Sequence, residues 1–267
     1  MQIAFSTLGC PDWTWSDIYA TAKDLNFNGI EVRGVANELY VPKAKRFTPE
    51  KIDSTIEKLK AGNMKISMLT TGIAVGEPCE DAIPQAKEYI DLAQKLSCKY
   101  IRIMISSKPQ PEQVNLEQAI DLYNQMCEYG ADKGVTPLIE TNGILANSKE
   151  MISFINRIQS ENKGILWDIH HPIRFFNETV EETYQTIKKH IKYVHVKDSI
   201  EKDGDIIYRM MGYGTIPVFD ALKILKDNGY DGYISLEWVK RWNPDLEEPG
   251  IVFAHFMSYI TFLLGRL

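Results

Sequence analysis

Two kinds of segment alternate along the whole chain, and this repetition leaves few folds open. Short apolar runs are each followed by a loop, a longer amphipathic stretch and a Gly or Asn. The short runs are almost continuously apolar, which is typical of parallel strands that are covered on both faces. Eight of them predict strands, at residues 3–6, 29–33, 65–70, 100–105, 136–140, 164–168, 193–196 and 233–237.

The longer stretches predict helices. We expect Ser16 to cap the first helix and Thr48 to cap the second, where Pro49 and Glu50 favour a helix start. Gly62 is the expected end of that second helix. Six further helices are expected at residues 81–96, 116–133, 148–159, 178–190, 217–228 and 251–264. Residues 197–215, after the seventh strand, form the one long insertion.

Strict alternation of eight strands and eight helices predicts right-handed β-α-β units. A closed barrel and an open doubly wound sheet both have this alternation. Eight units in 267 residues fit the barrel better, since such barrels usually contain about 250 residues. The turn after the first strand, residues 7–11, also lacks the G-x-G-x-x-G pattern of dinucleotide folds. Because no break in composition divides the chain, we expect residues 1–267 to form a single α/β domain, a (β/α)8 TIM barrel.

Charge and composition disfavour several classes of function. The net charge of −6 argues against nucleic-acid binding, which needs clustered Lys and Arg. No apolar run approaches the roughly 18–20 residues of a membrane span, and the first residues do not resemble a signal peptide. The four cysteines form no C-x-x-C pair, so reduced thiols are expected. We therefore expect a cytoplasmic protein that binds neither nucleic acid nor membrane.

Ionisable residues stand at the ends of four consecutive predicted strands: Glu140, Asp168, His195 and Glu237. The carboxyl ends of barrel strands meet at one face, so these side chains should converge. An unpaired buried carboxylate costs several kcal/mol, and three that converge without a cation would repel one another. A divalent cation removes both problems. Oxygen-rich ligands with one imidazole favour Mn²⁺, with Co²⁺, Mg²⁺ or Zn²⁺ as alternatives.

Two further polar residues near these strand ends are candidate substrate contacts. Lys197 shares the inward phase of His195, so it either contacts substrate or forms a salt bridge to Asp198 or a neighbour of Glu140. Asn142 could orient a ligand.

Arginine, tryptophan and glycine residues elsewhere in the chain also have expected roles. Arg33 and Arg102 are expected to pair with acids such as Glu31. Trp13, with Trp15, either forms a wall of the pocket or packs within its loop. Gly212 and Gly214 could cradle an anion before Pro217 or simply form a turn.

Seven segments together resemble the xylose isomerase-like family of sugar isomerase and epimerase barrels. This superfamily includes D-tagatose 3-epimerase-type enzymes, inosose dehydratases, hydroxypyruvate isomerases and endonuclease IV. The matching segments cover essentially the whole chain: Ile3-Ala4-Phe5-Ser6-Thr7, Asn28-Gly29-Ile30-Glu31-Val32-Arg33, the strand of Glu140, Asp168-Ile169-His170-His171, His195-Val196-Lys197-Asp198, residues 211–217 and Ser235-Leu236-Glu237-Trp238.

The resemblance implies roles for particular residues. It implies that the four residues named above are metal ligands and that His171 contacts substrate or positions a proton. It also implies that Glu140 and Glu237 act as acid and base on opposite faces of a substrate carbon. Family ketose 3-epimerases usually carry an Arg shortly after the seventh-strand His. Glu201 stands at that offset here and Arg209 is the nearest Arg downstream, so Arg209 is the expected substrate contact and free ketoses are disfavoured.

The expected activity is divalent-metal-dependent isomerisation or epimerisation of a small sugar or keto-sugar. It would proceed by proton abstraction next to a carbonyl, through a metal-stabilised enediolate. A lyase that dehydrates a keto-sugar or inosose begins with the same enolate and stays open. A non-catalytic binding barrel is a further alternative. The resemblance also implies a homodimer as the assembly. An endonuclease IV-like phosphodiesterase is disfavoured, because the third and fourth strands end near Thr70 and Ser106 without the extra His ligands.

Overall fold

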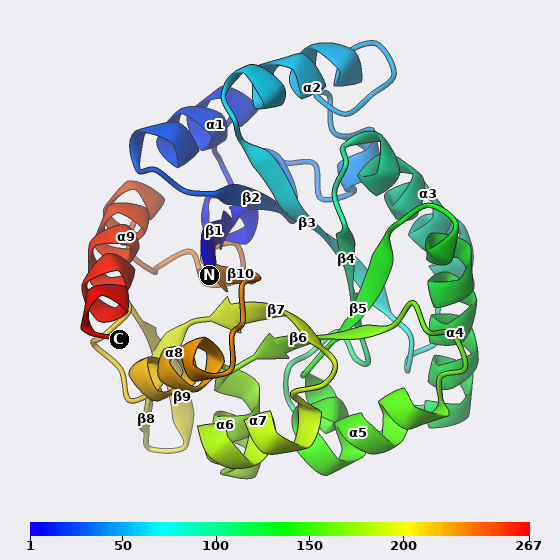
Figure 1. The fold of residues 1–267 in the computed structure, drawn as a ribbon, viewed down its shortest axis with the longest axis vertical. Helices are drawn as coiled ribbons and strands as arrows, with labels where there is room; N and C mark the ends of the chain where they lie inside the picture. The colour runs from blue at the N-terminus through cyan, green and yellow to red at the C-terminus, as the bar shows by residue number, and fades with distance from the viewer.

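Eight parallel strands close into a barrel in the order β1-β10-β7-β6-β5-β4-β3-β2, and helices surround it (Figure 1). The computed structural model describes all residues from Met1 to Leu267. The barrel strands are β1 (Gln2–Ser6), β2 (Gly29–Val32), β3 (Lys65–Ala74), β4 (Tyr100–Met104), β5 (Thr136–Glu140), β6 (Gly164–Asp168), β7 (Ile191–Val196) and β10 (Tyr233–Leu236). The predicted (β/α)8 fold is therefore confirmed.

The helices follow the predicted alternation, with different starts at two of them and one additional short helix, His170–Phe176, that was not predicted. They are α1 (Trp15–Asp24), α2 (Ile52–Ala61), α3 (Ala82–Lys95), α4 (Leu116–Ala131), α5 (Ser148–Arg157), α6 (His170–Phe176), α7 (Val180–Ile187), α8 (Val218–Asp227) and α9 (Pro249–Arg266). Thr14, rather than Ser16, caps α1, because it forms a reciprocal capping box with Asp17. Thr48 does not cap α2; its hydroxyl donates to the carbonyl of Lys45.

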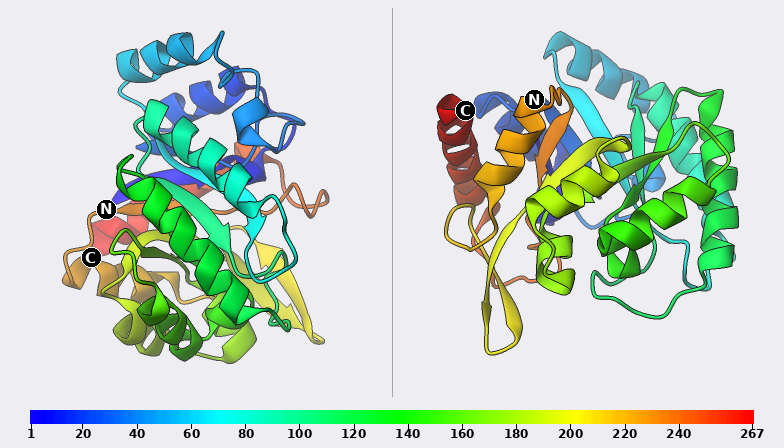
Figure 2. Two further views of the ribbon diagram at one scale, coloured as in Figure 1. Left: turned by 90° about the vertical axis from the view of Figure 1, so that its right-hand side faces the viewer. Right: turned by 60° about the horizontal axis from the view of Figure 1, so that its bottom comes forward.

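The long insertion after β7 contains an antiparallel hairpin that the sequence reading did not foresee. Strands β8 (Asp198–Lys202) and β9 (Asp205–Arg209) pair along their full length, and the hairpin extends away from the barrel (Figure 2). Asp203 and Gly204 connect them with φ values of 56° and 86°. An Asp-Gly pair with positive φ at both positions is a common two-residue hairpin turn.

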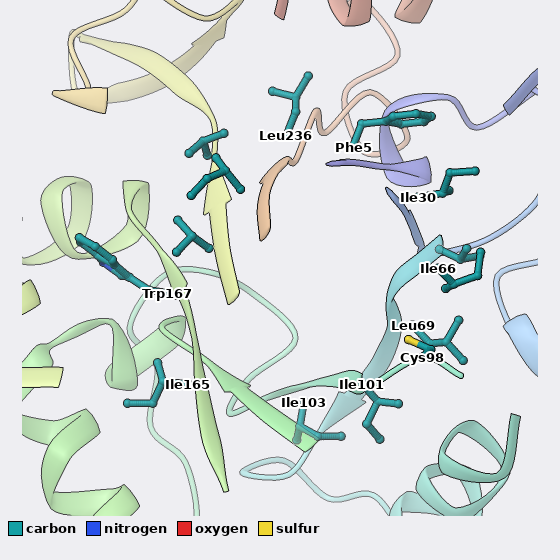
Figure 3. Close-up of a cluster of buried hydrophobic side chains, with 14 of the residues drawn as sticks. Phe5, Ile30, Ile66, Leu69, Cys98, Ile101, Ile103, Ile165, Trp167 and Leu236 are labelled. Carbon is teal, nitrogen blue, oxygen red and sulfur yellow. The ribbon is translucent and has the colours of Figure 1, made fainter. Parts of the chain in front are cut away.

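The apolar core lies between the barrel and the helices. Side chains alternate along each strand, so Ile101 and Ile103 of β4, and Ile165 and Trp167 of β6, point outward (Figure 3). They belong to a continuous cluster of 64 buried residues. Phe5 of β1 joins this cluster, with its ring centroid 4.4 Å from that of Phe253 in α9.

The inside of the barrel has an apolar layer below a polar one. Met68, Leu138, Leu166 and Tyr193 form a small buried cluster of their own. Because side chains alternate with a period of two, the residues two positions further along β5, β6 and β7 also point inward. Those residues are ionisable, so the charged layer of the barrel lies at the carboxyl ends of its strands.

The cysteines and the apolar character of the helices were two subjects of the sequence-based expectations. All four cysteines are free thiols, and burial raises the pKa of Cys98 to about 12, so this thiol is unreactive at neutral pH. None of the helices combines the length and the apolar character that crossing a membrane requires.

Candidate active site

The structure brings the four predicted metal ligands together. One ligand atom from each of Glu140, Asp168, His195 and Glu237 lies within 4.8 Å of the others, and all four residues are buried. His195 Nδ1 is 3.5 Å from both Glu140 Oε1 and Glu237 Oε1. Strand register accounts for this, since Asp168 pairs directly with His195 across β6 and β7.

Glu31 of β2 fixes the orientation of His195 from across the barrel. Its Oε2 lies 2.9 Å from His195 Nε2, and its Oε1 accepts a hydrogen bond of 2.9 Å from Thr70. In the neutral imidazole the proton is therefore on Nε2 and the lone pair on Nδ1, toward Glu140. Metal-binding histidines commonly donate their other N–H to a carboxylate in this way. Burial opposes a charge on His195, but Glu31 and Glu237 raise its pKa well above the ordinary value.

Two basic side chains of the protein lie among the carboxylates. Arg102 Nη1 is 3.2 Å from Glu140 Oε2 and 3.2 Å from Glu237 Oε1. The Lys197 ammonium contacts the carboxylates of Asp168 and Glu237. Burial raises the pKa of Glu140, but Arg102 and His195 outweigh it and lower the pKa to about 2. Two cations of the protein itself therefore offset part of the repulsion expected among the three carboxylates.

Two buried atoms nevertheless indicate that the site fits a metal ion. Glu140 Oε1 and His195 Nδ1 are fully buried and have no hydrogen-bond partner. Their separation of 3.5 Å is at the limit of a hydrogen bond. The distances from His195 Nδ1 to Glu140 Oε1, Glu237 Oε1 and Asp168 Oδ2 are 3.5, 3.5 and 4.0 Å, which suit donor atoms that surround one ion at about 2.0–2.3 Å each. Three carboxylates and one imidazole therefore form a donor set that suits a divalent cation.

Several expected pairings differ in the structure. Arg102 pairs with acids, as expected, but these are Glu140 and Glu237 rather than Glu31. Arg33 pairs with no acid, and its side chain donates to the carbonyl oxygen of Leu39. The sequence reading missed the role of Glu31 in orienting His195. The sequence did offer a signal, because Glu31 is the one charged residue in the otherwise apolar strand β2.

The segment from Gly212 to Gly214 does not present a free anion cradle. The carboxylate of Asp198 accepts hydrogen bonds from the backbone N–H groups of Gly212, Gly214 and Ile216, at 2.9–3.1 Å. The N–H groups expected to bind an external anion are thus used by the chain itself. This also explains why Lys197 does not pair with Asp198.

A cavity of about 880 Å³ opens above the carboxylates. His171 lines it, with Nδ1 2.9 Å from the carbonyl oxygen of Thr141. A carbonyl only accepts, so Nδ1 carries the proton and Nε2 offers a lone pair. Burial lowers the pKa of His171, which keeps the ring neutral at neutral pH. The charged and aromatic residues that line the cavity are Arg33, Arg102, Lys108, Glu140, Phe175, Lys197, Asp205, Tyr208, Glu237 and Trp242.

Three expected substrate contacts have different surroundings. Asn142 lines the cavity, but its amide binds backbone groups of Ile105 and Ser106 and so holds the loop after β4. Arg209 does not line the cavity; its neighbour Tyr208 does, because adjacent strand residues face opposite sides. Trp13 also lies outside the cavity and packs edge-on against Phe253 of α9, with centroids 5.6 Å apart.

Comparison with known proteins identifies the family. The model of the xylose isomerase-like TIM barrel family matches residues 19–252. The chain belongs to this family. Fructoselysine 3-epimerase of Shigella flexneri is 20 % identical over 234 residues, which cover 83 % of this chain and 84 % of that protein. An uncharacterized protein of Methanocaldococcus jannaschii is 34 % identical over 113 residues, but the match covers only 41 % of this chain and 38 % of that protein.

Solved structures of the same fold include proteins with different activities. The IolI protein, solved with a bound zinc atom, superimposes with a TM-score of 0.79 at 15 % identity and covers 100 % of this chain and 99 % of that chain. The probable 3-DHS dehydratase AsbF from Bacillus anthracis gives a TM-score of 0.77 at 18 % identity, over 98 % and 99 % of the two chains. A D-tagatose 3-epimerase-like protein gives 0.76 at 18 % identity, over 100 % and 98 %. At these identities the likeness concerns the fold alone.

Proposed function

We propose that the protein is a divalent-metal-dependent isomerase or epimerase that transfers a proton at the carbon next to the carbonyl of a small sugar or keto-sugar. The observation that carries the proposal is the pair of buried, unpartnered atoms Glu140 Oε1 and His195 Nδ1, which lie 3.5 Å apart. Glu140 also lines the cavity. With Asp168 and Glu237, Glu140 and His195 are the residues that would hold the ion. A bound divalent ion would polarise a substrate carbonyl and stabilise the negative charge that develops on its oxygen.

The acid and base of the proposed reaction are Glu140 and Glu237. Arg102 Nη1 lies 3.2 Å from an oxygen of each, so one guanidinium nitrogen contacts both carboxylates. A base must be ionised before it accepts a proton, and the lowered pKa values of both carboxyl groups favour that state in either residue. The residue that acts as acid must first take up a proton from solvent before it returns one to the substrate carbon. A lowered pKa also weakens the base, so the reaction depends on close positioning against the substrate carbon.

Two further side chains have suitable chemistry for binding substrate oxygens. The Lys197 ammonium, buried and lining the cavity, is a donor for an oxygen that gains negative charge. The unprotonated Nε2 of His171 is an acceptor for a substrate hydroxyl. A donor and an acceptor that line the same cavity suit a substrate in which a carbonyl group stands next to a carbon that carries a hydroxyl.

Three finer predictions accompany the proposal. The oxygen-rich donor set favours Mn²⁺ as the ion, with Co²⁺, Mg²⁺ and Zn²⁺ as alternatives. A cytoplasmic location and a homodimer stay predictions. Analytical ultracentrifugation of the purified chain measures the oligomeric state directly.

Proton exchange with solvent tests the proposal. The chelator-treated protein is incubated in D₂O with each ion in turn and with ketoses, inososes, 3-keto-glycosides and fructoselysine, the compound in the name of one relative. We expect NMR to show deuterium on the carbon next to a carbonyl, only in the presence of an ion. Glu140→Gln and Glu237→Gln should each slow exchange by about 10²- to 10⁴-fold. Glu57→Gln, which changes an exposed carboxylate on α2, is the matched control.

The products separate the proposed activity from its alternatives. Recovery of an epimer or an isomer supports the proposal, whereas loss of water with formation of an unsaturated ketone assigns the site to a dehydratase. Absence of exchange with every compound and every ion would refute proton abstraction at this site.

A further inference from the structure

Arg33 is a buried guanidinium that has no carboxylate partner. The residue is 9 % exposed and directly follows β2, and no acidic side chain forms a salt bridge with it. Its side chain makes one hydrogen bond, from Nη1 to the carbonyl oxygen of Leu39 at 3.3 Å. A buried charge without a partner is strongly unfavourable, so an anion that reaches it binds well.

The surroundings of Arg33 leave this guanidinium open toward the cavity. A Cβ built on Gly72 of β3 would come 3.2 Å from Arg33 Nη2, so any larger residue there would crowd the guanidinium. Trp242, after β10, lies with its ring centroid 5.9 Å from the Arg33 Cζ. All three residues line the same cavity as Glu140 and Glu237. The free edge of Arg33 therefore faces the space in which the substrate would bind.

The buried charges inside the barrel and along the cavity favour one additional anion. When His195 is neutral, as a metal ligand would be, the buried carboxylates of this site are four and its buried cations are three: Glu31, Glu140, Asp168 and Glu237 against Arg33, Arg102 and Lys197. Addition of a divalent ion to these changes a deficit of one positive charge to an excess of one. Arg33 is the cation of this set that lacks a carboxylate partner, so the excess is located at its guanidinium.

The size of the cavity also exceeds what a small free sugar fills. Small-molecule sites range from about 300 to 1,000 Å³, and the volume of about 880 Å³ lies in the upper part of that range. Room thus remains between the reacting centre and Arg33 for a second part of the substrate.

We infer that Arg33 binds an anionic group of the substrate, a carboxylate or a phosphate, so that the substrate is an acidic sugar derivative rather than a neutral one. The inference rests on the proposed function, because it takes the cavity to be a sugar site. Arg33 suits this role because a guanidinium can donate two parallel hydrogen bonds to either oxyanion. Trp242 covers one face of the guanidinium and leaves its edge for the ligand.

Isothermal titration of the full-length, Mn²⁺-loaded protein with three unreactive ligands tests the inference. The ligands are D-glucitol, which is neutral, D-gluconate, which carries a carboxylate, and D-glucitol 6-phosphate. We expect at least one anion to bind more tightly than D-glucitol, and the preferred anion distinguishes carboxylate from phosphate. Arg33→Met should weaken that anion by about 10- to 100-fold and leave D-glucitol unchanged. Arg33→Lys should give an intermediate loss, and Arg46→Met, at an exposed arginine, should give none.

A melting curve separates binding from a structural role. Because an unpaired buried charge is removed, Arg33→Met should melt at the same temperature as the wild type or higher. Equal affinities of the wild type for all three ligands, failure of both anions to bind, equal weakening of all ligands by Arg33→Met, or a clearly lowered Tm would each overturn the inference. The deuterium exchange experiment is independent of this one. Exchange with neutral ketoses, together with no effect of Arg33, would reject the anion subsite and retain the proposed function.

Discussion

Replacement of Glu31 by Gln tests whether the carboxylate behind His195 supports a metal site. Gln has the same shape and keeps an oxygen that accepts from His195 Nε2, but it removes the negative charge. Glu31 is 0 % exposed, so water does not screen that charge. The variant therefore changes the electron density on His195 Nδ1 without disturbing the packing of the barrel.

The expected loss follows from the geometry of this contact. The hydrogen bond to His195 is 2.9 Å long and fully buried, and a buried hydrogen bond to a charged group contributes about 1.5–3 kcal/mol. Loss of a carboxylate that supports a metal-binding His typically lowers metal affinity by about 10- to 100-fold. That range corresponds to about 1.4–2.7 kcal/mol, so the two estimates agree. We expect the Kd for Mn²⁺ to rise by about 30-fold.

Competition with a fluorescent chelator measures the Kd of the wild type and of each variant. Glu57→Gln removes the same charge from an exposed position on α2 and should leave the Kd unchanged. A Kd of Glu31→Gln within threefold of the wild-type value would refute the role of Glu31. An equal loss in Glu57→Gln would show instead that net charge, rather than the contact to His195, controls affinity.

Three further variants probe the polar contacts. Lys197→Met leaves two buried carboxylates without their ammonium, so the metal-free protein should lose about 3–5 kcal/mol of stability and Mn²⁺ should raise its Tm more than that of the wild type. Asp198→Asn weakens the backbone hydrogen bonds that order the segment after the hairpin; it should lower stability to urea by about 2–3 kcal/mol and speed proteolysis there. Tyr123→Phe removes a buried hydroxyl that bonds to two carbonyls and should cost about 1–2 kcal/mol in urea, with unchanged Mn²⁺ affinity.

Each of these variants has a matched control at an exposed position. Lys60→Met, Asp53→Asn and Tyr213→Phe make the same chemical changes on the surface and should shift stability by less than about 0.5 kcal/mol. If Lys197→Met leaves the metal-free Tm unchanged, the ammonium does not neutralise the carboxylates. Weakened Mn²⁺ binding in Tyr123→Phe would contradict the expectation that this core hydroxyl does not influence the metal site.

The four converging residues predicted as ligands could be located from sequence because strand periodicity fixes where side chains point. Leu138 lies two residues before Glu140 and Leu166 two before Asp168, so each apolar residue of the lower layer marks an inward position of the upper layer. Parallel strands in a barrel also present their carboxyl ends at one face. The positions of the ligands along the barrel axis therefore followed from local pattern alone.

Contacts across the barrel could not be derived in the same way. Strand β2, which carries Glu31, is separated from β7, which carries His195, by β1 and β10. Which residues meet across the interior depends on the stagger of the closed sheet, which no local pattern encodes. The same limit explains why the acids that pair with Arg102 are Glu140 and Glu237 rather than Glu31. Trp13 is a related case, because its partner Phe253 belongs to a helix 240 residues further along the chain.

The two layers inside the barrel have opposite effects on stability, so an ion that binds at the charged layer would stabilise the fold. The apolar layer of Met68, Leu138, Leu166 and Tyr193 stabilises the fold by burial. The charged layer above it does not, since replacement of a buried ion pair by apolar residues is commonly neutral or stabilising by about 1–4 kcal/mol. A chain that keeps this layer gives up stability in favour of chemistry. An ion that binds the folded barrel returns part of that stability by mass action, so the Tm should rise steadily with Mn²⁺ concentration above the Kd.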